Sequence, residues 1–343
     1  MILLGYRQLL NFVVIGSLII AAACAPTVEN HISKIEKPPA GQLFDAVLGV
    51  IATVPDTART AETLGTRRLG SGVLIDGNGL VLTIGYLILE AETTALIGPD
   101  GTVVAADVVA YDHETGFGLL RARQPIDAVP LQMGLAKNLK PGTRVLAVSH
   151  SAKGARNAVV AARIVSRRPF AGYWEYLIED ALFSVPPLQE YGGAALIDGN
   201  GRLIGIGSLL VNDAVPSHRP VFGNMFVPVD ILAPVIDELI ATGRRSSAGS
   251  PWLGARIDEA EGRVFITRLS AGGPGDKAGL QAGDYIIGVN GKRVNSMEDY
   301  LRKVRASGRA GDDIALDILP RGSSDLTIRR VIVSSMDRHD WLN

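Results

Sequence analysis

Residues 70–83, GSGVLIDGNGLVLT, form the stretch that decides the fold. Two short apolar runs flank the turn residues Asp-Gly-Asn-Gly at 76–79, a pattern typical of two antiparallel strands joined by a tight turn. The same four residues recur at 198–201, again between apolar runs. This repeat predicts two β-barrels of similar design, and the fold class is therefore mainly β.

Outward from this stretch, apolar segments separated by turn residues predict the other strands of both barrels. A segment with apolar residues at helical spacing and a final glycine, 229–243, predicts a helix that closes the second barrel. The predicted strands are 72–76, 80–84, 93–98 and 103–112 in the first barrel, and 144–150, 158–166, 173–180, 194–198, 202–211 and 224–229 in the second.

Three segments share a resemblance to one protease family. They are 70–83, then 109–120 (VAYDHETGFGLL), then 188–206 (LQEYGGAALIDGNGRLIGI). In this order they resemble the segment that leads to the catalytic His and the segments that carry the catalytic Asp and Ser of HtrA-type, trypsin-like serine proteases. The resemblance implies a chymotrypsin-like double β-barrel, with an active-site cleft between the barrels.

At the three catalytic positions, however, the sequence departs from that family. Tyr86 stands at the place of the His, Gly116 at the place of the Asp, and Gly192 at the place of the Ser. If the glycine pair is aligned differently, Tyr191 takes the serine place instead. A triad needs a nucleophile, a base and a group that orients the base. Glycine supplies none of these, and a phenol is a poor base at neutral pH. We therefore expect a pseudoprotease with no catalytic residues.

The C-terminal segment resembles a bacterial PDZ domain, most clearly at 273–291, GPGDKAGLQAGDYIIGVNG. The resemblance implies that a protein C-terminus binds as an added strand, with its carboxylate on backbone N–H groups. The helix 297–306 would line the pocket for the last side chain with Leu301 and Val304; the alternative is that these residues only fill the domain core. By the same resemblance the carboxylate-binding loop is Trp252, Leu253, Gly254 and Ala255.

The N-terminus indicates the compartment. A single charge, Arg7, precedes an apolar run at 12–23 and the only cysteine, Cys24. Twelve apolar residues are few for a membrane span and typical of a signal peptide. Ala-Ala-Ala-Cys resembles a lipoprotein processing site, except that Ala21 replaces the usual leucine. We expect lipidation at Cys24, with an uncleaved single-span anchor as the alternative. Both place the folded part on the periplasmic side of a bacterial cell envelope.

Composition and spacing give the domain plan. The 343 residues suffice for about two domains, and a net charge of −1 argues against a dedicated nucleic-acid surface. The basic pairs 67–68, 167–168 and 244–245 are expected in solvated turns. The predicted organisation is a signal at 1–24, a polar tether at 25–42, a protease-like domain at 43–243, a linker at 244–250 and a PDZ domain at 251–338.

Other side chains offer little alternative chemistry. His150 lies between Ser149 and Ser151, but neighbours on a strand point apart, so a turn without catalysis is expected. His113 is expected in a solvated turn. No cluster has the spacing of metal ligands and no loop has the pattern of a phosphate site, so neither a metal nor a cofactor is expected.

Three functions remain open. The first is a membrane-tethered binding protein whose PDZ domain takes protein C-termini or exposed peptides. The second is an active endopeptidase with a displaced nucleophile, for which Ser149, Ser184 and Ser217 are the candidates. The third is a structural subunit of an envelope complex. A homo-oligomer is compatible with each of these, and the sequence does not name the partner.

Overall fold

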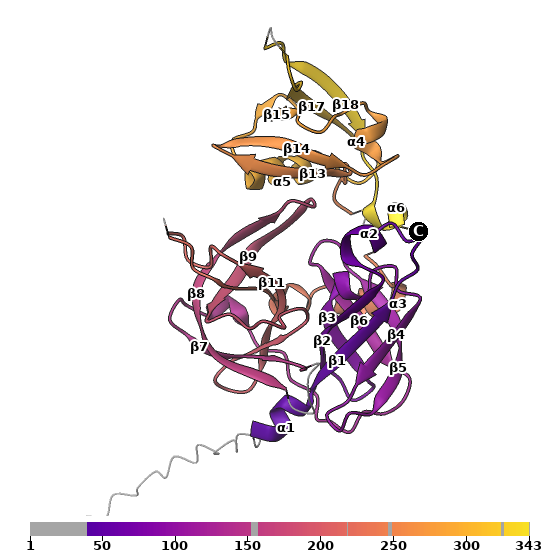
Figure 1. Ribbon diagram of the computed structural model, residues 1–343, viewed down its shortest axis with the longest axis vertical. Coiled ribbons are helices and arrows are strands. Elements are labelled where there is room, and N and C mark those ends of the chain that lie inside the picture. Colours follow the sequence, from indigo (N-terminus) through magenta and orange to yellow (C-terminus); the bar gives the residue numbers. More distant parts are fainter. Residues whose placement is uncertain (1–39, 152–156, 218, 246–248, 324–325, 343) are drawn as a thin grey trace, which may run out of the picture. The chain divides into compact units, whose positions relative to one another are not determined.

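The computed structural model describes residues 40–151, 157–217, 219–245, 249–323 and 326–342. Its first β-barrel is closed, with strand order β1-β2-β3-β6-β5-β4, and each strand is antiparallel to its neighbours (Figure 1). The short helices α1 (Ala40–Asp45) and α2 (Ala61–Leu64) lie before β1 and β2 in the chain. The strands are β1 (Val47–Thr53), β2 (Arg67–Leu74), β3 (Leu80–Ile84), β4 (Thr93–Ile97), β5 (Val103–Tyr111) and β6 (Phe117–Ala122).

The second barrel is also closed, with order β10-β11-β12-β9-β8-β7. The two barrels follow the same strand plan, which confirms the mainly β fold expected from the repeated turn. In both turns an aspartate holds the chain: Asp76 accepts from the backbone of Asn78 and Leu80, and Asp198 from Asn200 and Arg202. The strands are β7 (Arg144–Ser149), β8 (Ala158–Gly172), β9 (Tyr176–Val185), β10 (Ala195–Ile197), β11 (Leu203–Val211) and β12 (Gly223–Pro228).

The helix predicted over 229–243 is shorter than expected. Residues Val229–Ile231 form a 3-10 turn, and the α-helix α3 covers only Ile236–Thr242. Pro234 explains the difference, because proline lacks the N–H that a continuous helix would need there. The predicted stop is present: Gly243 adopts φ 77° and its N–H bonds the Leu239 carbonyl.

After residue 249 the chain forms a sheet of order β13-β14-β15-β17-β18, with β16 paired to β15. Strand β13 therefore lies at an edge of this sheet. Helix α5 begins at an N-cap, Ser296, whose side chain accepts from Asp299 N–H at 3.1 Å. The elements are β13 (Ala255–Ala260), β14 (Arg263–Leu269), α4 (Pro274–Lys277), β15 (Tyr285–Val289), β16 (Lys292–Arg293), α5 (Met297–Ala306), β17 (Asp313–Leu319), β18 (Arg329–Ser334) and α6 (Arg338–Leu342).

None of the three basic pairs is solvated in a turn as predicted: Arg167 and Arg168 lie inside strand β8, with the Arg168 guanidinium over the Phe183 ring. Arg68 is only 4% exposed, and its guanidinium donates to the carbonyls of Tyr86 and Leu89 at 2.9 and 2.7 Å. Arg245 makes two hydrogen bonds to the buried carboxylate of Asp112. Both arginines satisfy buried acceptors that two-residue sequence patterns do not reveal.

The prediction for His113 is also wrong. Its ring nitrogens are buried without a hydrogen-bond partner, and its ring meets Tyr111 edge-on at 4.3 Å. Burial, followed by the charge of Arg338, lowers the pKa of His113 to about 2, so the imidazole is neutral at physiological pH. It packs as an aromatic ring. No group of metal-binding side chains occurs within the described ranges.

The N-terminal signal, Cys24 and most of the predicted tether lie outside the described residues. None of the helices in the described part of the chain has the length and apolar character that crossing a bilayer requires.

Candidate functional site

Tyr86 lies in a short 3-10 turn, Gly85–Leu87, directly after β3. Its hydroxyl donates to the carbonyl of Ser208 on β11 at 3.0 Å, so the side chain reaches from the first barrel to the second. The Arg68 guanidinium donates a hydrogen bond to the Tyr86 carbonyl and so fixes the turn. Burial, with the nearby Tyr191, raises the pKa of the Tyr86 phenol, which therefore stays protonated.

Gly192 lies opposite this phenol. Its carbonyl accepts from Ser71 N–H at 2.8 Å, and a Cβ added to Gly192 would lie 2.9 Å from Tyr86 Oη. A side chain at 192 would therefore point at the place expected for the catalytic base. This geometry favours Gly192 over Tyr191 as the residue that corresponds to the serine.

Gly116 adjoins the same turn, because Gly85 N–H donates to the Gly116 carbonyl at 2.7 Å. Gly116 has φ 76°, a conformation that side-chain-bearing residues rarely adopt. A Cβ there would lie 2.8 Å from the hydroxyl of Tyr176, which donates to Thr115 carbonyl at 2.6 Å. The space that a side chain at 116 would need is therefore taken by a buried tyrosine from the second barrel.

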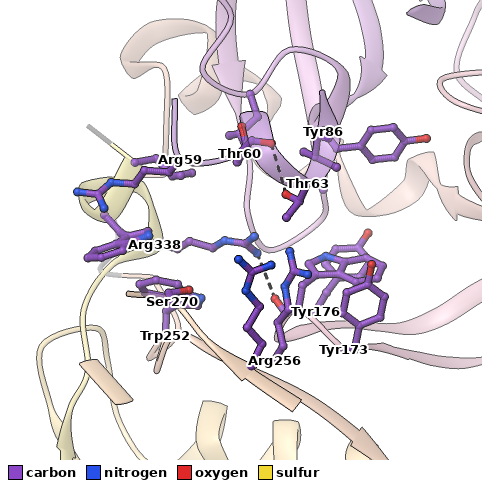
Figure 2. A pocket seen from close by; sticks show the side chains of 18 of the residues that line it. Arg59, Thr60, Thr63, Tyr86, Tyr173, Tyr176, Trp252, Arg256, Ser270 and Arg338 are labelled. Atoms are coloured by element: carbon purple, nitrogen blue, oxygen red, sulfur yellow. Dashed lines mark hydrogen bonds between the residues drawn. The ribbon is translucent and has the colours of Figure 1, made fainter. Parts of the chain in front are cut away.

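Tyr86, Gly116 and Tyr176 border a cavity of about 540 Å³. Its wall includes Tyr86, Gly116, Tyr176 and Tyr191, together with Gly254 from the predicted carboxylate loop. Figure 2 shows the side chains of Tyr86, Tyr173 and Tyr176 along one side and Trp252 on the other. The structure thus brings Tyr86, Gly116 and the predicted carboxylate loop to one space, which the sequence did not predict.

Four arginines also line this cavity, and sequence reasoning missed all of them. Arg59 lies over the ring of Trp341 at 3.9 Å, and Arg338 donates to the Trp174 carbonyl at 3.2 Å. The other two are Arg256 and Arg268. They come from three separated parts of the chain, so no sequence motif could have grouped them.

His150 does not reach this cavity. It follows β7, its backbone N–H donates to Ser71 Oγ at 2.9 Å, and its side chain lies against Gly49. Burial lowers the pKa of His150. The hydroxyl of Ser149 is buried without a hydrogen-bond partner, so these two neighbours do not form a nucleophile and base pair.

In the C-terminal domain, Leu301 and Val304 lie on one side of α5 and are only 4% and 3% exposed. They belong to the buried cluster of this domain, which also contains Leu253 and Ala255. One member of the cluster, Leu177, comes from β9 of the second barrel. Trp252 is also buried, against Trp341.

The loop at 253–254 already holds a carboxylate. Backbone N–H groups of Leu253 and Gly254 donate to the two carboxylate oxygens of Glu175 at 3.1 and 3.0 Å. Glu175 lies in the turn between β8 and β9, where the sequence predicted a continuous strand over 173–180. That prediction is wrong at its start, since β9 begins only at Tyr176.

Residues 70–206 match the family model of the trypsin-like peptidase domain. The chain carries a trypsin-like peptidase domain. Residues 265–311 match the model of a PDZ domain, so the order of the two domains is the one expected from the sequence.

Its homologues are HtrA/Deg family serine proteases. They include the probable periplasmic serine endoprotease DegP-like of Bartonella henselae, 25% identical over 75% of this chain and 51% of its own length. Serine endoprotease DegS of Escherichia coli K12 is 26% identical over 78% of this chain and 77% of its own. The chain spans only 51% to 57% of the length of four of these curated relatives, the Bartonella protein among them.

Solved structures agree on the fold. The HtrA-type protease AlgW with tripeptide has a TM-score of 0.53 at 19% identity, over 87% of this chain and 96% of its own. A serine endoprotease from Yersinia pestis has a TM-score of 0.52 at 23% identity, over 88% of this chain and 98% of its own.

Proposed function

We propose that this protein is a membrane-tethered, non-catalytic HtrA-like protein that binds protein C-termini or exposed peptides in the cell envelope. The peptidase domain serves as a scaffold or docking surface, and the PDZ domain receives the ligand. The site would be Trp252, Leu253, Gly254 and Ala255 for the carboxylate, with Leu301 and Val304 for the last side chain.

The observation that carries the proposal is the contact between Tyr86 and Gly192. A serine protease needs a hydroxyl at one position and a base at the other, close enough to exchange a proton. Here the first position has no side chain, and the second holds a phenol bonded to the Ser208 carbonyl. Because burial raises the pKa of that phenol, even less of the phenolate, the form that could accept a proton, is present than in water.

The alternative of a displaced nucleophile finds less support. The hydroxyls of Ser149 and Ser184 are buried and have no hydrogen-bond partner, so no base activates them. The Ser217 hydroxyl donates to the Arg219 carbonyl at 2.6 Å. A nucleophile must instead give its proton to a base.

The location in the envelope rests on the apolar run before Cys24 and on relatives whose names call them periplasmic. Peptide binding rests on the PDZ match and on the likeness to AlgW, which was solved with a tripeptide.

Binding without cleavage is the first testable prediction. A peptide with an apolar last residue and a free carboxylate should bind residues 25–343 and be recovered intact. Amidating its end should weaken binding by roughly tenfold to a hundredfold, because charge-assisted hydrogen bonds contribute about 1.5–3 kcal/mol. Gly254→Val should also weaken it, since Gly254 has φ 71° and a Cβ would lie 3.3 Å from Pro274.

Titration calorimetry measures the affinities, and mass spectrometry of the peptide detects cleavage. Equal affinity for free and amidated ends, in both wild type and Gly254→Val, would contradict the groove and favour the structural-subunit function. Cleavage blocked by a serine-directed reagent would favour the displaced nucleophile.

Anchoring gives the second prediction. Full-length protein expressed in a bacterium should incorporate labelled palmitate, and Cys24→Ala should abolish incorporation because the acyl chains attach to that thiol. Labelling in cells, followed by gel fluorography, measures this. Absence of label in the wild type would contradict lipidation, and retention of unlabelled protein in membranes would indicate a single-span anchor.

A further inference from the structure

The turn between β8 and β9 imitates a bound peptide. Residues 172 and 176 pair across it, leaving a three-residue loop of Tyr173, Trp174 and Glu175. The two strands extend to the C-terminal domain, where Figure 1 shows their tip beside β13 and α5. The carboxylate of Glu175 accepts backbone bonds from Leu253 and Gly254.

The backbone of the same loop also bonds to the PDZ domain as a bound peptide would. Ile257 N–H on β13 donates to the Tyr173 carbonyl at 2.9 Å. Because β13 is an edge strand, this bond uses a donor that an added strand would take. The Glu175 carboxylate thus contacts the loop at 253–254, and the Tyr173 carbonyl, two residues earlier, contacts the edge of β13.

An apolar side chain completes the contact. Leu177 is 2% exposed and lies in the same buried cluster as Leu301 and Val304, the residues proposed to receive a ligand's last side chain. The hairpin therefore supplies a carboxylate, a backbone carbonyl that pairs with the edge of β13, and an apolar side chain. These are the three features by which a PDZ groove holds a C-terminus.

The backbone of Glu175 indicates that this side chain has a use. Glu175 has φ 60°, in the left-handed region that glycine or asparagine normally occupies at the last position of a three-residue hairpin loop. A glutamate there costs conformational free energy. The bonds to Leu253 and Gly254 are the contacts that offset this cost.

We propose that the 173–177 hairpin tip is a built-in ligand of the PDZ groove, and that an external C-terminus binds by displacing Glu175. This inference rests on the proposed peptide-binding function and adds its regulation. An ion pair between Arg302 and Glu179, 2.7 Å, also joins the hairpin to α5, but it is half-exposed and adds little.

Burial weakens the hold of the loop on the carboxylate. Enclosure of the carboxyl group outweighs the backbone hydrogen bonds and the charge of Arg338, and raises the pKa of Glu175 to about 7. Tyr300, buried in α5, is the other titratable group that faces it. The docked Glu175 carboxylate is poorly solvated and regains water when the hairpin leaves the PDZ groove. This gain favours replacement of the hairpin by an external C-terminus.

The test compares Glu175→Ala and Glu175→Gly with Glu261→Ala in residues 25–343. Glu261 is a matched control, since it is an exposed glutamate with φ 53° in another turn. The glycine variant also relaxes the backbone, so it keeps the fold even if alanine does not. The first readout is hydrogen exchange at the amides of Leu253 and Gly254, which should be at least tenfold faster in both Glu175 variants and unchanged in the control.

The second readout is retention of a pool of randomised octapeptides with Val, Leu, Ile or Phe at a free C-terminus. The Glu175 variants should retain at least tenfold more peptide than the wild type and the control. Unchanged hydrogen exchange at the amides of residues 253–254 in both Glu175 variants would overturn the proposal that the hairpin tip is a built-in ligand. Faster exchange with no peptide retained by any variant would overturn the proposed peptide-binding function, and with it the competition, while leaving the docked hairpin as a structural contact.

Discussion

Restoring all three catalytic residues, Tyr86→His, Gly116→Asp and Gly192→Ser, is expected to leave the protein without measurable cleavage of casein. The first and third changes are compatible with the structure, because removing the phenol frees the space that a serine at 192 needs. The second is not. An aspartate at 116 would need φ near 76° and would collide with the Tyr176 hydroxyl at 2.8 Å.

Without a correctly placed aspartate, a serine and histidine pair loses about 10⁴-fold in turnover, since the histidine tautomer is not fixed. The matched control is the double variant Tyr86→His and Gly192→Ser. It should be as inactive as the triple variant and melt at a higher temperature. Casein assays with a serine-directed reagent, together with thermal unfolding, measure both effects. Activity that appears only in the triple variant would contradict this account of Gly116.

Gly193→Ala should lower the free energy of unfolding by about 3 kcal/mol, the largest stability loss expected from adding one methyl group here. Gly193 has φ 75°, and an added Cβ would lie 1.8 Å from the Ser71 carbonyl and 2.7 Å from Thr83 Oγ1. Those atoms belong to β2 and β3 of the first barrel, so the clash separates the two barrels.

Urea unfolding of residues 25–343 measures the loss. Gly199→Ala is the control, because no atom lies within 4 Å of a Cβ at Gly199. We expect the control to lie within about 0.5 kcal/mol of the wild type. A Gly193 variant as stable as the control would show that the barrels separate at little cost.

Local sequence patterns predicted the barrels because each turn carries its own signal. Asp76 and Asp198 bond the backbone of their own loops, so four residues suffice to indicate the turn. The helix at 229–243 was overestimated because its apolar spacing continues through Pro234, which interrupts the backbone bonds.

The candidate site was predictable only in part. The proposed loss of catalytic side chains rests on Tyr86, Gly116 and Gly192, which can be read from the sequence. At Gly116 the space that a side chain would need is taken by Tyr176, about 60 residues away in the chain, and no local pattern records such a tertiary contact. Glu175 was hidden for another reason: a glutamate between aromatic residues favours a strand, and only the fold forces it into a left-handed turn.

The bond from Tyr86 to Ser208 has a consequence for how such a cleft evolves. A working enzyme must keep its cleft open to substrate, and the polar groups held ready there commonly cost stability. In the proposed function that demand is absent, and the Tyr86 phenol can join the two barrels. Under this proposal the position serves cohesion and not turnover, so a gain of catalysis would have to begin by loosening the protein.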